Sequence, residues 1–245
     1  MIDTHAHIYS EYYDVENLVN YLKENGIIKV INNSTNNTDA LEVIELSKKY
    51  SNFLLPAVGV HPESVSDYNL DEIENIIKNN KIVAVGEVGL DYHWTKDNKE
   101  KQKELLVKQI LLANKYNLPL IIHVRDSIQD CLDIIKKYKS RGVIHCFSGS
   151  YEMAKEFIKY GYKLGIGGVL TFKNSKLYEV IEAIDLDNFV LETDSPYLTP
   201  EPFRGRKNNP SNVYYVAEKI AEIKKISVEE VIEKTTKTAL KFFDI

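Results

Sequence analysis

Residues that can bind metal ions recur at the ends of short apolar segments along this sequence. They include five of the six histidines and two acids: His5, His7, His61, Glu87, His123, His145 and Asp194. Imidazole nitrogens and carboxylate oxygens are common ligands of divalent metals. His5 and His7 stand one residue apart, and in a strand such side chains project to the same side about 7 Å apart. These residue types and spacings predict a metal site.

The metal site is favoured by the placement of these residues as a set. Each residue taken alone has an ordinary explanation. A single buried histidine is more often a hydrogen-bonded core residue than a ligand. His93, which follows the segment that carries Glu87, is expected to be a surface loop residue. A buried Glu87 or Asp194 without a partner would be costly, because burial removes the carboxylate from water. Bound cations would compensate both charges.

Glu87 is the candidate for a bridging ligand. A carboxylate can bind two cations about 3.5–4 Å apart, and segments that carry histidine lie on both sides of Glu87 in the sequence. Gly86 and Gly89 either leave room beside this carboxylate or mark a bend at the end of a strand. We therefore expect two divalent cations, and the ligand types leave Mg, Mn, Zn, Co or Ni open.

The elements that must position these residues are short strands that alternate with helices. Eight segments have the apolar, β-branched character of strands: 2–7, 27–34, 53–62, 82–91, 119–125, 142–149, 162–168 and 189–196. Between them, apolar residues recur at helical spacing, as at Leu105, Leu106, Ile110 and Ala113. The alternation predicts an α/β fold, a (β/α)8 TIM barrel formed as a single domain over residues 1–245, in which all carboxyl ends of the strands meet at one face. A doubly wound open sheet is the alternative.

One more helix is expected after the eighth unit. Residues 226–243 combine helix-forming residues with apolar residues at helical spacing. Ser227 and Glu230 have the spacing of a capping box at its start. The barrel is thus predicted to carry an added C-terminal helix.

Composition and charge limit the function classes. The net charge is −5 and the pI is near 5.8, so any nucleic-acid partner must bind at a local site. We find no segment of roughly 20 apolar residues and no basic, apolar leader at the start, so we expect no membrane association and a cytoplasmic location. In that compartment Cys131 and Cys146 are expected to be reduced thiols. Nothing points to an obligate protein partner.

Six motifs resemble those of the TatD family of metal-dependent deoxyribonucleases, within the amidohydrolase-like barrels. In order they are DTHAH, GVHP, GEVGLDY, HVRD, HCFSG, and ETDSPYLTP followed by RGRKNNP, and they span residues 3–210. One histidine pair is a weak signal, whereas six motifs in one order form a specific one. The resemblance implies one cation held by His5, His7, Glu87 and Asp194 and a second held by Glu87, His123 and His145.

The activity implied by the resemblance is hydrolysis of DNA phosphodiester bonds by metal-activated water. Asp194 is the expected base and Glu87 the bridging catalytic ligand. His61, left over once two cations are satisfied, is assigned to the substrate phosphate together with Arg125.

Further contacts to DNA, single-stranded or at a processed end, are expected from Arg204 and Tyr92. Arg204 belongs to a basic cluster with Arg206 and Lys207, and Tyr92 accompanies Trp94 and Tyr197 as possible stacking rings. The alternative for the basic cluster is a solvated loop, and the alternative for the aromatic rings is ordinary packing. The chain departs from the family pattern at Ala6, Val124 and Phe203, and the last of these bears on substrate preference.

Two other functions remain open at this stage. The same metal site could hydrolyse a small amide or ester or an aminoacyl-RNA ester. Many barrels that cleave cyclic amides bridge their metals with a modified lysine, and segment 119–125 has none, which weakens this alternative. A metal-stabilised binding protein is the non-enzymatic alternative, although a structural zinc site normally has four protein ligands and no open position.

Overall fold

Eight parallel strands alternate with helices in the computed structural model, which describes residues 1–94 and 97–245. The strands are β1 (Ile2–Ala6), β2 (Lys29–Asn33), β3 (Leu54–Ala57), β4 (Val85–Asp91), β5 (Leu120–Arg125), β6 (Gly142–Ile144), β7 (Tyr162–Ile166) and β8 (Phe189–Leu191). The helices are α1 (Val15–Glu24), α2 (Asn37–Lys49), α3 (Leu70–Asn79), α4 (Lys99–Lys115), α5 (Ile128–Lys137), α6 (Tyr151–Lys159), α7 (Tyr178–Ala183), α8 (Val213–Lys224) and α9 (Val228–Phe243). Short 3₁₀ turns are η1 (Pro62–Ser64), η2 (Gly168–Thr171), η3 (Leu186–Asn188) and η4 (Pro210–Asn212). All eight expected strand segments are found.

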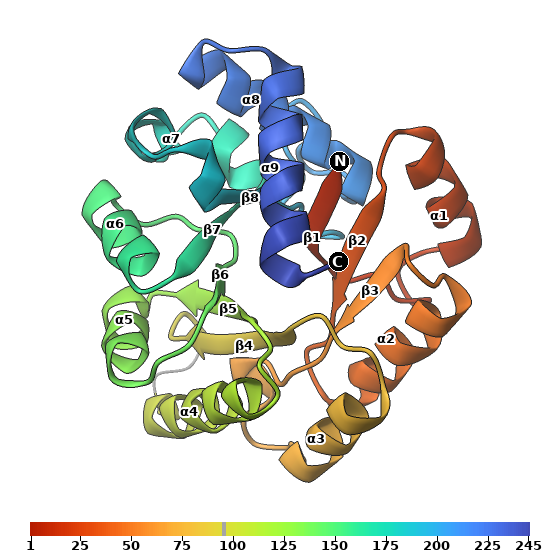
Figure 1. Ribbon diagram of the computed structural model, residues 1–245, viewed down its shortest axis with the longest axis vertical. Coiled ribbons are helices and arrows are strands. Elements are labelled where there is room, and N and C mark those ends of the chain that lie inside the picture. The colour runs from red at the N-terminus through yellow and green to blue at the C-terminus, as the bar shows by residue number, and fades with distance from the viewer. Residues whose placement is uncertain (95–96) are drawn as a thin grey trace.

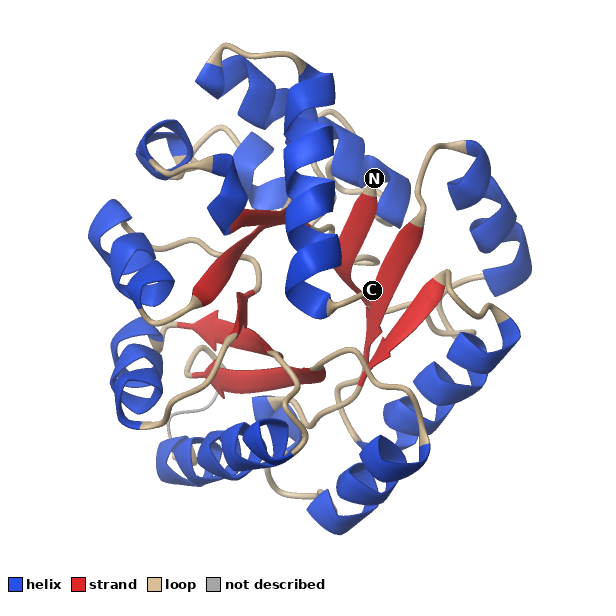
Figure 2. Ribbon diagram, in the orientation of Figure 1, coloured by secondary structure: helices blue, strands red, loops and turns tan. Residues whose placement is uncertain are grey.

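The strands form a ring surrounded by helices (Figure 2). Their ladders fall into two parallel sheets, of order β1-β2-β3 and β4-β5-β6-β7-β8. Parallel bridges join the sheets at both edges, between Ala57 and Ala84 and between Ala6 and Ser195. The predicted TIM-barrel-like α/β fold is therefore confirmed, and the doubly wound open sheet is not observed.

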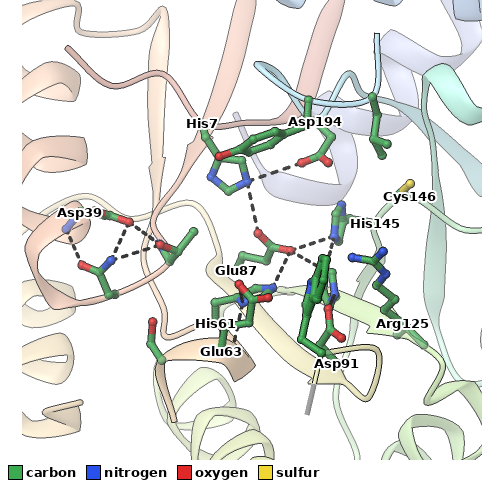
Figure 3. A pocket seen from close by; sticks show the side chains of 18 of the residues that line it. His7, Asp39, His61, Glu63, Glu87, Asp91, Arg125, His145, Cys146 and Asp194 are labelled. Atoms are coloured by element: carbon green, nitrogen blue, oxygen red, sulfur yellow. Dashed lines mark hydrogen bonds and ion pairs between the residues drawn. The ribbon is translucent and has the colours of Figure 1, made fainter. Parts of the chain in front are cut away.

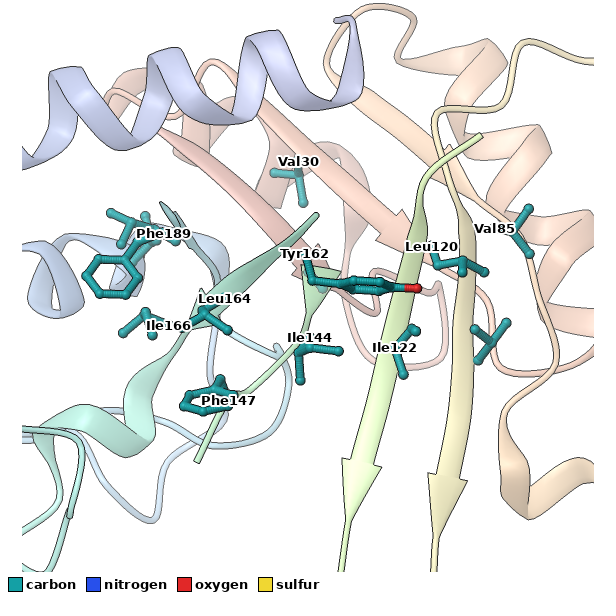
Figure 4. Packing of buried hydrophobic residues seen from close by; sticks show 14 of the residues in the cluster. Val30, Val85, Leu120, Ile122, Ile144, Phe147, Tyr162, Leu164, Ile166 and Phe189 are labelled. Carbon is teal, nitrogen blue, oxygen red and sulfur yellow. The ribbon is translucent and has the colours of Figure 1, made fainter. Parts of the chain in front are cut away.

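Alternating side chains along the strands pack into two separate apolar layers. Leu120, Ile122 and Ile144 belong to the large layer between strands and outer helices, part of which Figure 4 shows. Ile121 and Val143 belong to a smaller cluster that draws on six strands and on α9, and on no helix from α1 to α8. Because successive strand residues point to opposite faces, this smaller cluster is the interior of the ring.

The C-terminal helix closes the amino end of the ring. Helix α9 crosses the face on which both termini lie (Figure 1), and its Ala239 and Phe243 join the interior cluster next to Ile2, the first residue of β1. Ser227 caps the helix by accepting from the Glu230 backbone N–H at 3.1 Å, as expected. The Glu230 carboxylate instead pairs with Lys234 at 2.9 Å. The carboxyl ends of the strands therefore remain as the open face.

Two further sequence expectations concern thiols and membranes. Cys131 and Cys146 are both free. Among the helices of residues 1–94 and 97–245, none has the length and apolar character required to cross a bilayer.

Candidate metal centre

Strand alternation carries the candidate ligands to the open end of the barrel. Ile121 and Val143 face the interior, and two positions further along the chain come His123, on β5, and His145, directly after β6. Since residues two apart share a face, both imidazoles point inward at the carboxyl end. Figure 3 shows the resulting group around Glu87, which comes from β4.

One oxygen of Glu87 faces the ligands from the first and last strands. Its Oε2 lies 3.5 Å from His5 Nε2 and 3.2 Å from His7 Nε2. Asp194 Oδ1 lies 3.4 and 3.5 Å from the same two nitrogens. The Asp194 backbone N–H donates to the His5 carbonyl at 2.9 Å, so the segment after β8 is tied directly to β1.

The other oxygen of Glu87 faces the ligands from β5 and the segment after β6. Its Oε1 lies 2.9 Å from both His123 Nδ1 and His145 Nε2. His61 Nε2 is further away, at 3.7 Å. Glu87 therefore stands between two groups of nitrogens, with one oxygen directed at each.

The charge on Glu87 depends on the surrounding histidines. Its side chain is only 4% exposed, and burial by itself raises the pKa of a carboxyl group. The charge of His145 and the hydrogen bond with His123 help to outweigh that effect, and the pKa of Glu87 lies well below its ordinary value. A carboxylate is thus kept ionised at the bottom of the site, where it can bind cations.

Two of the candidate ligand histidines form hydrogen bonds on the side away from Glu87, and these bonds show which nitrogen of each imidazole carries a proton. His7 Nδ1 lies 3.0 Å from the Asn33 carbonyl oxygen, and His123 Nε2 lies 2.9 Å from Asp91 Oδ2. Both partners only accept, so each of these ring nitrogens must be an N–H donor. The inward nitrogens of His7 and His123 then present lone pairs to the centre, as metal ligands must.

His61 is arranged the opposite way. Its Nδ1 accepts the Glu63 backbone N–H at 3.2 Å, so the proton of a neutral ring is on Nε2. Burial lowers the pKa of His61 to about 3 and keeps the ring neutral. Its inward nitrogen is therefore a hydrogen-bond donor, which distinguishes His61 from the ligands even though it lies close enough to be grouped with Glu87 and His123.

The donor set fits divalent cations. Inward nitrogen and oxygen atoms form three overlapping groups, each within 4.8 Å, drawn from His5, His7, His61, Glu87, His123, His145 and Asp194. Imidazole lone pairs combined with carboxylates suit Zn²⁺, Mn²⁺ and related ions. All six predicted metal ligands are thus brought together, and their role as ligands stays a prediction.

Two acids behind the ligands were missed in the sequence. Asp91 holds His123, and Glu192 Oε1 lies 3.6 Å from His145 Nδ1 while it accepts the Cys146 backbone N–H at 2.6 Å. The signal for Asp91 was its position four residues after Glu87 on one strand, which places both on the same face. Asp91 is positioned to orient His123 through this hydrogen bond, whereas Glu192 lies beyond hydrogen-bond distance of His145 Nδ1.

The glycines around Glu87 permit a close approach of β4 and β5. A Cβ on Gly86 would lie 2.8 Å from Ile121 Cβ, and one on Gly89, where φ is +148°, would lie 2.0 Å from the His123 carbonyl oxygen. Both positions need glycine for backbone packing. The β4–β5 register also shifts between Val85 and Val88, which agrees with the expected bend, and the close strand packing is an additional reason for glycine that the sequence did not indicate.

The predicted substrate residues divide into two sets. His61 and Arg125 line a cavity of about 820 Å³ that contains the centre. Tyr92 and Arg204 do not line it: the Tyr92 hydroxyl donates to Asp130 at 2.8 Å, and the Arg204 guanidinium lies 4.1 Å from the centre of the Phe172 ring. Ordinary packing therefore accounts for both contacts.

We predict that metal binding releases protons. Although burial lowers the pKa of His7, Asp194 and Glu87 outweigh it and raise that pKa to about 10. Without cations His7 is therefore protonated at pH 7, and a cation must displace that proton, so apparent affinity rises as pH rises towards about 10. Calorimetric titration in two buffers of different ionisation enthalpy measures the release. No net proton release at pH 7 would contradict this electrostatic description.

We also predict that Asp91→Ala weakens one cation site selectively. Loss of an outer partner of a ligand histidine typically costs 10- to 100-fold in metal affinity, and Asp91 contacts only the His123 side of Glu87. Competition with a chelating dye measures the affinity of each site. Asp126→Ala is the control, because its exposed carboxylate contacts His93. Equal metal affinities in the two variants would contradict a role for Asp91 in metal binding.

Comparison with known proteins agrees with this geometry. The family model described as TatD related DNase matches residues 2–244. The uncharacterized metal-dependent hydrolase YabD of Bacillus subtilis is 40% identical, covering 100% of this chain and 99% of its own length. Human deoxyribonuclease TATDN3 is 33% identical over 99% of this chain and 94% of its own length.

A solved structure gives the same result for the fold. The TatD homologue YJJV from Escherichia coli K12 superposes with a TM-score of 0.94 at 30% identity, over 100% of this chain and 98% of that one. Family model, relatives and structure therefore all span essentially the whole sequence. The chain belongs to the TatD related DNase family and is a metal-dependent hydrolase.

Proposed function

We propose that this hydrolase cleaves phosphodiester bonds of DNA at a centre of two divalent cations bridged by Glu87. The observation that carries the proposal is the division of the donors by the two oxygens of that carboxylate. His5, His7 and Asp194 lie on the Oε2 side, and His123 and His145 lie on the Oε1 side. A single cation could not contact both groups as well as two cations that share Glu87.

When bound, such cations lower the pKa of coordinated water and stabilise charge on phosphoryl oxygens. The proton released from the attacking water needs an acceptor, and Asp194 is the better placed of the two central acids. Its side chain is 15% exposed against 4% for Glu87. Despite burial, His5 and His7 hold its pKa below the ordinary value, so it is a carboxylate at neutral pH.

His61 and Arg125 are assigned to the phosphate. The His61 Nε2–H points into the centre from the Glu87 Oε1 side and can donate to a phosphoryl oxygen. Arg125 lines the same cavity, and its guanidinium lies 5.3 Å from the centre of the Trp94 ring. No ion pair joins Arg125 to an acid within the described parts of the chain, so its donors are available to an anion.

DNA is favoured as the substrate by the cavity and by the relatives. The family description and the human relative both name deoxyribonuclease activity. Trp94 and Tyr197 are 66% and 51% exposed where they line the cavity, and such rings can stack on unpaired bases. Together these features support a single strand or a processed end rather than intact duplex, in which the bases are already stacked.

A small-molecule amidohydrolase has less support. No lysine is found among the described residues that line the cavity, so the modified lysine used as a bridge in many such enzymes has no counterpart there. Glu87, which belongs to two of the three donor groups, is the proposed bridge instead.

We predict metal-dependent cleavage that requires Glu87. Metal-stripped protein is incubated with 5′-labelled single-stranded DNA while Mg²⁺, Mn²⁺, Zn²⁺ or Co²⁺ is restored one at a time. Shortened products should form only with metal, and Glu87→Gln should lower the rate by at least about 10³-fold because the bridge is lost. Glu11→Gln, an exposed change in the same cavity, should retain activity. Two bound ions without cleavage of DNA would favour small ester substrates instead.

A further prediction separates His61 from the ligands. Because its inward nitrogen is a donor, His61→Ala should leave the metal content unchanged while kcat falls by about 10²–10³-fold, as when a donor to a developing anion is removed. Metal content is read by mass spectrometry, with His123→Ala as the comparison that should lose metal. Loss of metal from the His61→Ala variant would contradict this prediction and show that His61 is a metal ligand.

A further inference from the structure

A second cavity lies beside the barrel, away from the ligand group. It has a volume of about 460 Å³ and is formed by the end of α1, the loop after β8 and the start of α8. Its lining residues are Met1, Tyr21, Asn25, Phe203, Arg206, Lys207, Asn209, Ser211, Asn212, Tyr214 and Tyr215. None of the residues assigned to the metal centre is among them.

The charge of this cavity is opposite to that of the whole protein. The chain has 36 acidic and 31 basic residues, yet the described lining residues include Arg206 and Lys207 and no Asp or Glu. Glu218 contacts Tyr214 but does not line the cavity. Such a local excess of positive charge attracts anions even when net charge is negative.

Aromatic rings accompany the two cations. Tyr21 and Tyr214 are 47% and 39% exposed. Phe203 and Tyr215 pack edge to face with ring centres 5.1 Å apart, and the Arg206 guanidinium lies 5.7 Å from the Phe203 ring centre. Exposed rings beside fixed cations are the combination that binds single-stranded nucleic acid, whose bases stack while phosphates pair with the cations.

A single loop connects this cavity with the metal centre. Tyr197 lines the catalytic cavity, and Lys207, ten residues later, lines the second one. The Lys207 ammonium donates to the backbone carbonyl of Tyr12, and the Tyr12 hydroxyl lies 3.1 Å from that of Tyr197. Tyr12 also lines the catalytic cavity, so these two contacts connect Lys207 to that cavity, while Met1 and Asn25 place the opposite part of the second cavity towards the amino end of the barrel.

We propose that the second cavity is a subsite for the strand that flanks the cleaved phosphodiester bond, with Arg206 on a phosphate and Tyr214 on a base. The inference rests on the proposed function, because the occupant is the substrate strand itself. It also assigns the basic cluster: Arg206 and Lys207 face this subsite, whereas Arg204 packs on Phe172. Phe203, the departure from the family pattern, supports Arg206 there.

Equilibrium binding tests the subsite independently of cleavage. A fluorescein-labelled 12-nucleotide single strand is titrated with the intact protein in EDTA, and its anisotropy gives Kd. Arg206→Glu should raise Kd about tenfold and reduce the salt dependence. Tyr214→Ala should raise it at least about fivefold through lost stacking. Lys101→Glu, which makes the same charge change on exposed α4, is the control and should bind as wild type.

Three results would overturn the subsite. Equal Kd values for wild type and both cavity variants, or no binding by wild type, would contradict it. Light scattering that shows a dimer lost in Arg206→Glu would make this face an interface between two copies instead. Circular dichroism verifies that the variants are folded. Strand binding without any metal-dependent cleavage would support the subsite and contradict the proposed nuclease activity, so the two failures are distinguishable.

Discussion

One buried carboxylate organises the functional end of this barrel. Glu87 is held ionised at 4% exposure, which would be unfavourable without compensating positive charge. Four strands or the segments after them supply the nitrogens that surround it, and each oxygen faces a different group. Gly86 and Gly89, on either side of Glu87, allow β4 to approach β5 closely. The proposed two-cation centre and its activation of water both depend on this arrangement.

The orientation of each histidine follows from the group behind it. An acceptor behind His7 or His123 leaves the inward nitrogen with a lone pair, whereas a donor behind His61 leaves it with a proton. The same residue type at neighbouring strand ends thus presents either a lone pair or an N–H to the centre, and this difference underlies the proposed division into metal ligands and a phosphate donor. The backbone and the outer acid Asp91, rather than the imidazoles themselves, determine this division.

Much of the fold and of the ligand group could be predicted from the sequence, because parallel strands repeat one pattern: inward residue, then ligand, at the carboxyl end. The exact strand ends could not be predicted: the expected segment 189–196 extends beyond Leu191, where β8 ends, although the backbone of Asp194 still bonds to His5. Contacts between elements that are distant in the sequence could not be predicted either. Tyr92 resembled a stacking ring, yet it bonds to Asp130 of α5. Arg204 likewise packs on a ring far away in the sequence.

The central claim is that Glu87 bridges two cations, and anomalous diffraction from crystals grown with Mn²⁺ or Zn²⁺ tests it most directly. We predict two anomalous peaks about 3.5–4 Å apart, one beside Glu87 Oε2 with His5, His7 and Asp194, the other beside Oε1 with His123 and His145. A single peak, or a second peak that does not contact Glu87, would contradict the account.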